Sequence, residues 1–139
     1  MYLIDNDIFN LLIAGNSVVA DKVQRNQSIL WLSSIAAEEI LTGHLSGINR
    51  ARSAQNALSL PKAHDRFVRT LENLLLLPVF SYSEEAETVY QTFAPATLRI
   101  GPQDCRIAAQ ALAHNMTIVT RNLRDFQAIG APCEDWSAE

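Results

Sequence analysis

Short apolar segments alternate with longer segments of helical periodicity along this chain. The apolar segments cover residues 2–4, 29–32, 77–82 and 117–120, with residues 132–136 as a weaker fifth. Strands that alternate with helices are typical of βαβ units, in which the strands run parallel. The pattern therefore predicts an α/β fold with a central, mostly parallel sheet of four to five strands.

Several of the intervening helices have recognisable start signals. Ser34 precedes an apolar stripe, Ser83 precedes a group of glutamates, and Pro102 stands at the favoured first position of a helix. Residues 50–76 are expected to form one or two further helices, with a break at Pro61.

Length and composition are those of one globular domain covering residues 1–139. The chain is 48% hydrophobic and contains no repeat or low-complexity linker. Acidic residues outnumber basic ones by 15 to 11, and taken alone this balance argues against electrostatic binding of nucleic acid. An acid at position five excludes a signal peptide, and no apolar run approaches the ~20 residues of a membrane span. We expect a cytoplasmic protein that does not associate with membranes.

Acidic residues cluster where the predicted parallel strands end. Asp5 follows the first strand, Asp125 follows the fourth, and Asp104 lies on the apolar face of a helix in its first turn. Glu38 and Glu39 follow the second strand, and helix geometry alone does not choose between them. Open α/β sheets place their binding sites at this edge.

Each of these acids also has a structural explanation. Asp5 suits the N-cap of a helix beginning near Ile8, Asp104 complements a helix dipole, and Asn122 with Asp125 resembles a capping box. The group as a whole is harder to explain, because clustered carboxylates repel one another unless a cation neutralises them. An all-oxygen set without cysteine or nearby histidine suits Mg²⁺ or Mn²⁺. The corresponding chemistry is metal-assisted attack on a phosphate.

Five segments, in order along nearly the whole chain, resemble one known family. They are residues 2–7 (YLIDND), 33–43 (SSIAAEEILTG), 100–104 (IGPQD), 118–126 (IVTRNLRDF) and 134–136 (EDW). Together they are similar to PIN-domain ribonucleases, and within that superfamily to the VapC-type toxins of bacterial toxin-antitoxin pairs. The resemblance implies a three-layer α/β/α fold and a metal-dependent endoribonuclease.

The resemblance also implies roles for individual residues. The match to the family's Glu-(Leu/Ile)-x-x-Gly helix selects Glu39 over Glu38. Asp5 and Asp104 resemble the principal metal ligands, Glu39 completes the site directly or through water, and Asp125 resembles a fourth catalytic acid. Either Glu39 or Asp125 would act as general base. The family further implies Mg²⁺ or Mn²⁺ as cofactor, a tRNA or rRNA loop as substrate, a VapB-like antitoxin and a homodimer.

One departure from the family pattern keeps other functions open. Asp5-Asn6-Asp7 stands where the family has Asp-Thr-Asn, which adds a carboxylate near the expected metal. Whether Asn122 or Asp125 completes the site is also undecided. One alternative is a catalytically inactive PIN-fold metal-binding or interaction module. The other is a haloacid dehalogenase-like phosphatase, because Asp5-x-Asp7 resembles the nucleophile motif of that family.

Two groups of arginines are candidates for contact with RNA. We favour the group near the acids as RNA contacts and interpret the second as solvated helix faces. The first group is Arg99, Arg106, Arg121 and Arg124, and the second is Arg50, Arg52, Arg66 and Arg69.

Overall fold

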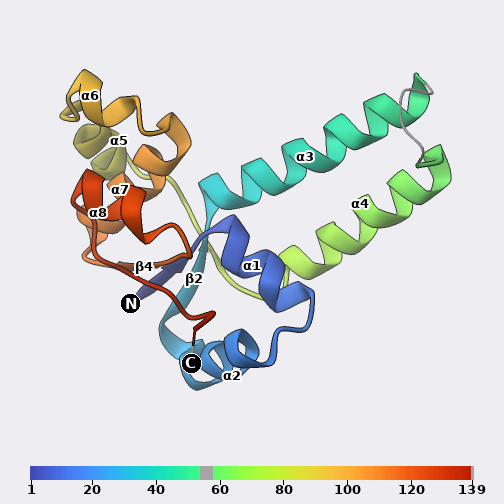
Figure 1. Ribbon diagram of the computed structural model, residues 1–139, viewed down its shortest axis with the longest axis horizontal. Helices are drawn as coiled ribbons and strands as arrows, with labels where there is room; N and C mark the ends of the chain where they lie inside the picture. Colours follow the sequence, from blue (N-terminus) through green and yellow to red (C-terminus); the bar gives the residue numbers. More distant parts are fainter. Residues whose placement is uncertain (54–57, 139) are drawn as a thin grey trace.

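A parallel sheet lies at the centre of the molecule (Figure 1). The computed structural model describes residues 1–53 and 58–138. The strands are β1 (Tyr2–Ile4), β2 (Leu30–Ser33), β3 (Val79–Phe80), β4 (Thr117–Val119) and β5 (Cys133–Glu134). They pair in the order β3-β2-β1-β4-β5, and every pair is parallel. The predicted parallel sheet is confirmed, and each predicted apolar segment overlaps one strand.

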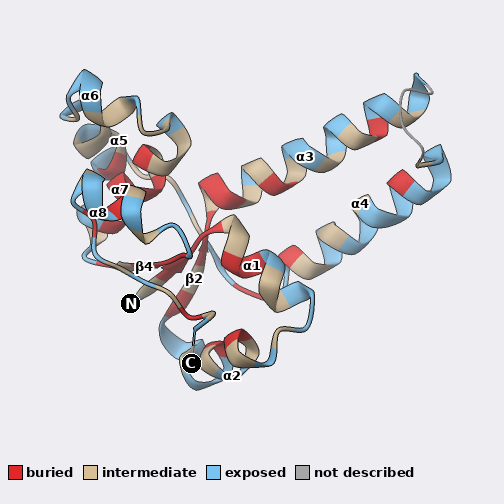
Figure 2. Ribbon diagram, viewed as in Figure 1, coloured by how far each residue is buried: buried red, intermediate tan, exposed pale blue. Residues whose placement is uncertain are grey.

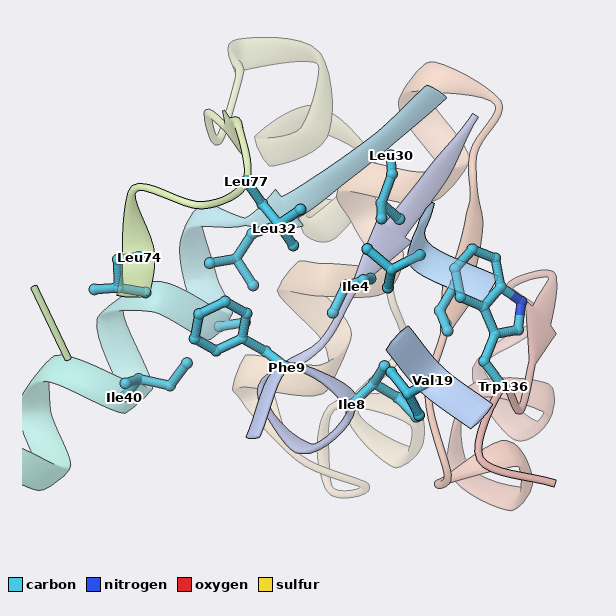
Figure 3. Packing of buried hydrophobic residues seen from close by; sticks show 13 residues of the cluster. Ile4, Ile8, Phe9, Val19, Leu30, Leu32, Ile40, Leu74, Leu77 and Trp136 are labelled. Atoms are coloured by element: carbon cyan, nitrogen blue, oxygen red, sulfur yellow. The ribbon is translucent and has the colours of Figure 1, made fainter. Parts of the chain in front are cut away.

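Helices cover both faces of this sheet. They are α1 (Asn6–Ile13), α2 (Ser17–Arg25), α3 (Ser34–Arg52), α4 (Leu60–Leu74), α5 (Glu84–Gln91), α6 (Pro95–Leu98), α7 (Pro102–His114) and α8 (Leu123–Ile129), with a 3₁₀ turn η1 (Gln27–Ile29). Ile4 and Leu32 point into a core formed with α1, α2 and the start of α3, where Phe9 projects towards Leu32 and Ile40 (Figure 3). Leu3 packs on the opposite face against α7 and α8. The fold is therefore a three-layer α/β/α arrangement, as predicted.

The helix starts follow from local capping. Ser33, and not Ser34, is the N-cap of α3, because its hydroxyl accepts hydrogen bonds from the backbone of Ile35 and Ala36. Ser83 caps α5 as expected. Among residues 1–53 and 58–138, none of the helices combines the length and the apolar character that crossing a bilayer requires.

The two long helices α3 and α4 pack side by side and extend away from the sheet as a hairpin (Figure 1). Pro61 lies in the first turn of α4, so it begins this helix instead of interrupting one. Of the segment expected to be helical between positions 50 and 76, residues 54–57 lie outside the described residues. We call residues 43–53 and 58–72 the helical arm. Most of the surface of this arm is exposed (Figure 2).

Candidate active site

The carboxyl end of β1 is the point where the strand order changes direction. β1 is the central strand, with β2 on one side and β4 on the other. Parallel sheets form their ligand sites at such a point, because the segments after the two neighbouring strands separate there. The backbone N–H of Asp5, directly after β1, donates to the carbonyl of Val119 in β4 at 3.2 Å. Asp5 therefore lies at the predicted position for a site.

Asp5 is a buried carboxylate that forms no ion pair with a basic side chain of the described residues. Its side chain is the N-cap of α1 and accepts a hydrogen bond from the N–H of Ile8 at 3.1 Å, so the capping interpretation is confirmed. Only 5% of the residue is exposed. Burial raises the pKa of Asp5 to about 6, although hydrogen bonds from Thr120 and Ile8 act in the opposite direction and Asp7 and Asp104 add repulsion.

Two further acids reach the same edge from different helices. Glu39 comes from α3 and Asp104 from the first turn of α7. Burial, followed by repulsion from Asp104 and Asp5, raises the pKa of Glu39. Burial, followed by repulsion from Asp125, raises the pKa of Asp104. The neighbouring Glu38 is exposed and accepts a hydrogen bond from Gln103 at 2.9 Å, so it is engaged outside the acidic group.

Asn122 connects the last of the acids to this group. It occupies the N-cap position of α8, but its side chain makes no cap hydrogen bond, so the capping-box interpretation is wrong. Its side-chain amide instead donates to Asp125 at 3.0 Å and lies 3.5 Å from a carboxylate oxygen of Asp104. The amide nitrogen of Asn122 therefore lies between these two carboxylates, and its hydrogens offset part of their mutual repulsion. We call Asp5, Glu39, Asp104 and Asp125 the acidic edge.

The additional acid at position 7 is neutralised by an arginine. Arg121 donates two hydrogen bonds to the Asp7 carboxylate, both of 2.7 Å, and they lower the pKa of Asp7. Asp7 therefore adds less negative charge to the acidic edge than the sequence indicates. Arg121 is occupied by this pair, and Arg106 stacks over the ring of Tyr90 at 4.6 Å.

The donor chemistry of the acidic edge suits a hard divalent cation. Its groups are carboxylates with amide and hydroxyl neighbours, and among the described residues no basic side chain forms an ion pair with Asp5, Glu39 or Asp104. Within the same residues, no three acidic, histidine or cysteine side chains stand close enough together to hold a metal ion. The residue types fit Mg²⁺ or Mn²⁺, and binding such an ion requires the side chains to move closer together.

The family model for the PIN domain matches residues 2–132. The chain belongs to the PIN domain family. Members of this family are generally nucleases. No curated protein matches the sequence significantly.

Solved structures with the fold of this PIN domain include several complexes. They are FitAB bound to an IR36 DNA fragment (20% identity, TM-score 0.76, covering 100% of this chain and 97% of that chain), DNA-bound VapBC from Salmonella typhimurium (24%, 0.75, 97% of both chains) and a toxin-antitoxin complex from Klebsiella pneumoniae (19%, 0.64, 93% and 92%). At these identities the likeness establishes the fold alone.

Sequence reasoning missed two contacts of the PIN-domain site. Thr120 is fully buried and hydrogen-bonded to Asp5, and Arg121 binds Asp7 across 114 positions of sequence. The signal for both is the pairing of β1 with β4, which places Ile4 opposite Val119. The residues that follow each strand are then neighbours, but this requires the strand order to be known.

Proposed function

We propose that this PIN domain is a Mg²⁺- or Mn²⁺-dependent endoribonuclease, the toxin of a VapBC-type toxin-antitoxin pair. One observation carries the proposal. Asp5, Glu39 and Asp104 come from three separate elements and gather at the carboxyl end of β1, and none of them forms an ion pair within residues 1–53 and 58–138. Burial and mutual repulsion make this group costly unless a cation is bound. A purely structural role for the acids does not explain that cost.

The side chains divide the work of hydrolysis in this proposal. Asp5 and Asp104 hold the divalent ion, with Glu39 completing the site. When bound, the ion lowers the pKa of a water molecule and stabilises charge on the scissile phosphate. Glu39 is only partly buried and its pKa is raised, so it is suited to accept a proton from the attacking water. Asp125 and Asn122 hold Asp104 in position.

RNA cleavage by the purified protein tests this assignment. We expect cleavage of single-stranded or loop RNA with Mg²⁺ or Mn²⁺, none with EDTA, and none by Asp5→Asn or Asp104→Asn. An exposed acid outside the site provides the control, and Asp65→Asn should cleave normally. Cleavage by both site variants would contradict the proposal. The RNA cleaved in cells, whether a tRNA or an rRNA loop, is identified by sequencing new 5′ ends after induction.

An inactive PIN module is the second candidate, because the acids are not arranged as a ready metal site. Calorimetric titration with Mn²⁺ shows whether the acids bind a metal, and toxicity on expression separates the nuclease from an inactive module. Binding that is lost in Asp104→Asn, together with toxicity on expression that the same change removes, would exclude the inactive module. A phosphomonoesterase assay tests the phosphatase alternative, which the occupation of Asp7 by Arg121 disfavours.

A VapB-like antitoxin and a homodimer belong to the same proposal. Support for the antitoxin comes from similar solved structures that are VapBC or toxin-antitoxin complexes. Co-expression of a small protein encoded beside this gene should relieve toxicity and inhibit cleavage. Light scattering of the purified chain should give twice the mass of one chain, and a monomeric mass would contradict the dimer.

A further inference from the structure

An open cleft of about 370 Å³ connects the helical arm with the acidic edge. Asn6 and Glu39 line it near the sheet, and Arg50 and Arg66 line it further out on the arm. Glu39 and Arg50 both belong to α3 and are eleven positions apart, which corresponds to about 16 Å along a helix. The cleft is within the size range of small-molecule sites and leads directly from the proposed cleavage centre.

The floor of this cleft includes two glycines of α3, which add no side chain to it. Gly43 and Gly47 lie between Glu39 and Arg50 on the same face of α3, since positions four apart share a helix face. A Cβ atom at either glycine would meet nothing within 4 Å, so no internal packing requires glycine there. Glycine inside a helix costs about 1 kcal/mol relative to alanine. The two glycines leave room for a chain to pass along α3.

The two arginines in the cleft have no acidic partner. Among the described residues the ion pairs involve Arg25 and Arg121, and neither Arg50 nor Arg66 forms one. The arm contains five basic and two acidic side chains, whereas the whole chain contains 11 and 15. The acidic excess of the protein therefore lies entirely outside the arm. Positive charge is available in the cleft for an anionic ligand.

We infer that the cleft binds the RNA strand on one side of the scissile phosphate, with Arg50 and Arg66 contacting backbone phosphates a few nucleotides from the acidic edge. This inference deepens the proposed function and rests on it for the identity of the substrate. An RNA strand carries negative phosphates at regular intervals. A strand that is cleaved at the acidic edge and continues along the cleft would bring such phosphates to the guanidinium groups of Arg50 and Arg66. Phosphate contacts fix affinity and register, so the two arginines position the strand and do not select its sequence.

Two double variants distinguish RNA binding in the cleft from a general effect of removing positive charge. Arg50→Ala/Arg66→Ala removes the arginines of the cleft, and Arg52→Ala/Arg69→Ala removes two exposed arginines of the same helices that do not line it. Binding of a labelled single-stranded oligoribonucleotide is measured by fluorescence anisotropy in an Asp104→Asn background. We expect the cleft variant to bind about tenfold more weakly, with a salt dependence reduced by about 1.4 in log-log slope, and the matched variant to change little.

Two further measurements separate positioning from a structural effect. With Asp104 intact, the cleft variant should raise KM for RNA cleavage about tenfold at unchanged kcat, since its arginines bind substrate away from the reacting atoms. Gly47→Leu should weaken RNA binding without any change of charge, because it fills the cleft. Cooperative thermal unfolding at or above the temperature of the wild type confirms for each variant that the fold is intact.

The outcomes distinguish this inference from the proposed function. Equal weakening by the two double variants, or none by the cleft variant, would overturn the inference even if the wild type cleaves RNA. Binding of poly-glutamate that depends on Arg50 and Arg66, with RNA binding unaffected by them, would also overturn it in favour of an acidic protein segment. If the wild type cleaves no RNA but the cleft variant alone loses oligonucleotide binding, the proposed function fails and the cleft remains a nucleic-acid backbone site.

Discussion

The acidic edge and the helical arm differ in the sign and the burial of their charged side chains. Asp5 is 5% exposed and its carboxylate forms no ion pair in the part of the chain that the structure describes, whereas Arg50 and Arg66 are exposed in an open cleft. The acidic edge is built from elements spread over the whole chain, while the arm is a single hairpin of α3 and α4. The net charge of −4 averages over these two regions and describes neither. A nucleic acid would meet positive charge along the arm and, at the sheet, negative charge that requires a metal ion.

The largest expected effect is a loss of RNA cleavage on substitution of Glu39, which belongs to the acidic edge, and not of the adjacent Glu38, which does not. Glu39→Gln should lower RNA cleavage by about 10²–10⁴-fold, because it removes the proposed proton acceptor. Glu38→Gln is the matched control and should retain nearly full activity, since Glu38 is exposed and contacts Gln103. Initial rates on one oligoribonucleotide compare the two. Equal losses would contradict the selection of Glu39.

Asp5→Asn should stabilise the metal-free protein at neutral and higher pH. The pKa of Asp5 is about 6 in the folded chain against 3.8 ordinarily, so between these values the folded state binds more protons than the unfolded state. Stability from this group is therefore full below pH 3.8 and is lost as pH rises through 6. Asparagine does not titrate and still caps α1, so the free energy of unfolding of the variant should exceed that of the wild type by up to about 3 kcal/mol at pH 8.

Urea unfolding at pH 4 and pH 8, with EDTA, measures this difference. Asp65→Asn on the exposed surface of the arm is the control and should change stability by no more than about 0.5 kcal/mol at either pH. A variant Asp5→Asn that is less stable than the wild type at pH 8 would show that the buried carboxylate is not under electrostatic stress.

Substitution of glycine by alanine should stabilise the protein at Gly47 in the arm and destabilise it at Gly130, at the end of α8. Gly47→Ala should raise the free energy of unfolding by about 0.5–1 kcal/mol, because its Cβ meets nothing and alanine favours the helix. Gly130→Ala should lower it by about 1 kcal/mol or more, since Gly130 has a φ of +96° at the end of α8. Denaturant unfolding compares the two, and amide hydrogen exchange should show the gain within the arm. A loss of stability in Gly47→Ala would mean that the cleft floor packs more closely than described.

The smallest effect concerns the ion pair beside the acidic edge. Arg121→Ala leaves the Asp7 carboxylate unpaired, and its repulsion should raise the pKa of Asp5 further. The pH midpoint of Mn²⁺ binding should then shift upwards, because the ligand must lose its proton before the metal binds. The double change Asp7→Asn/Arg121→Ala should restore the original midpoint, and failure to do so would separate Asp7 from the metal site.

The sequence predicts the fold and the position of the site because both depend on local pattern and on the parallel direction of the strands. Asp5 is expected at this edge because it follows the first strand, and Asp104 because it lies in the first turn of a helix, on the face that packs on the sheet. Contacts that depend on strand order were not predicted, including those of Thr120 with Asp5 and Arg121 with Asp7. Helix geometry alone does not choose between Glu38 and Glu39. The resemblance to the family selects Glu39, and in the structure Glu38 accepts a hydrogen bond from Gln103 of α7 instead of facing the acidic edge.

The arm shows a second limit of local pattern. The arginines at positions 50 and 66 have the spacing of ordinary solvated helix faces, and their sequence neighbours give no sign of a cleft. Their common cleft with Glu39 arises only when α4 packs beside α3. The helix α2 was also not predicted, although Asn16 caps it by accepting a hydrogen bond from the backbone N–H of Val19.

The central position of the first strand also determines when the acidic edge can assemble during synthesis. β1 pairs with β2 on one side and with β4 (Thr117–Val119) on the other. A nascent chain that has not yet released β4 from the ribosome cannot enclose Asp5 or place Thr120 and Asn122 beside the other acids. Domains fold as units once their long-range contacts are available. An interrupted translation product that ends before residue 117 is thus expected to lack the nuclease activity proposed above.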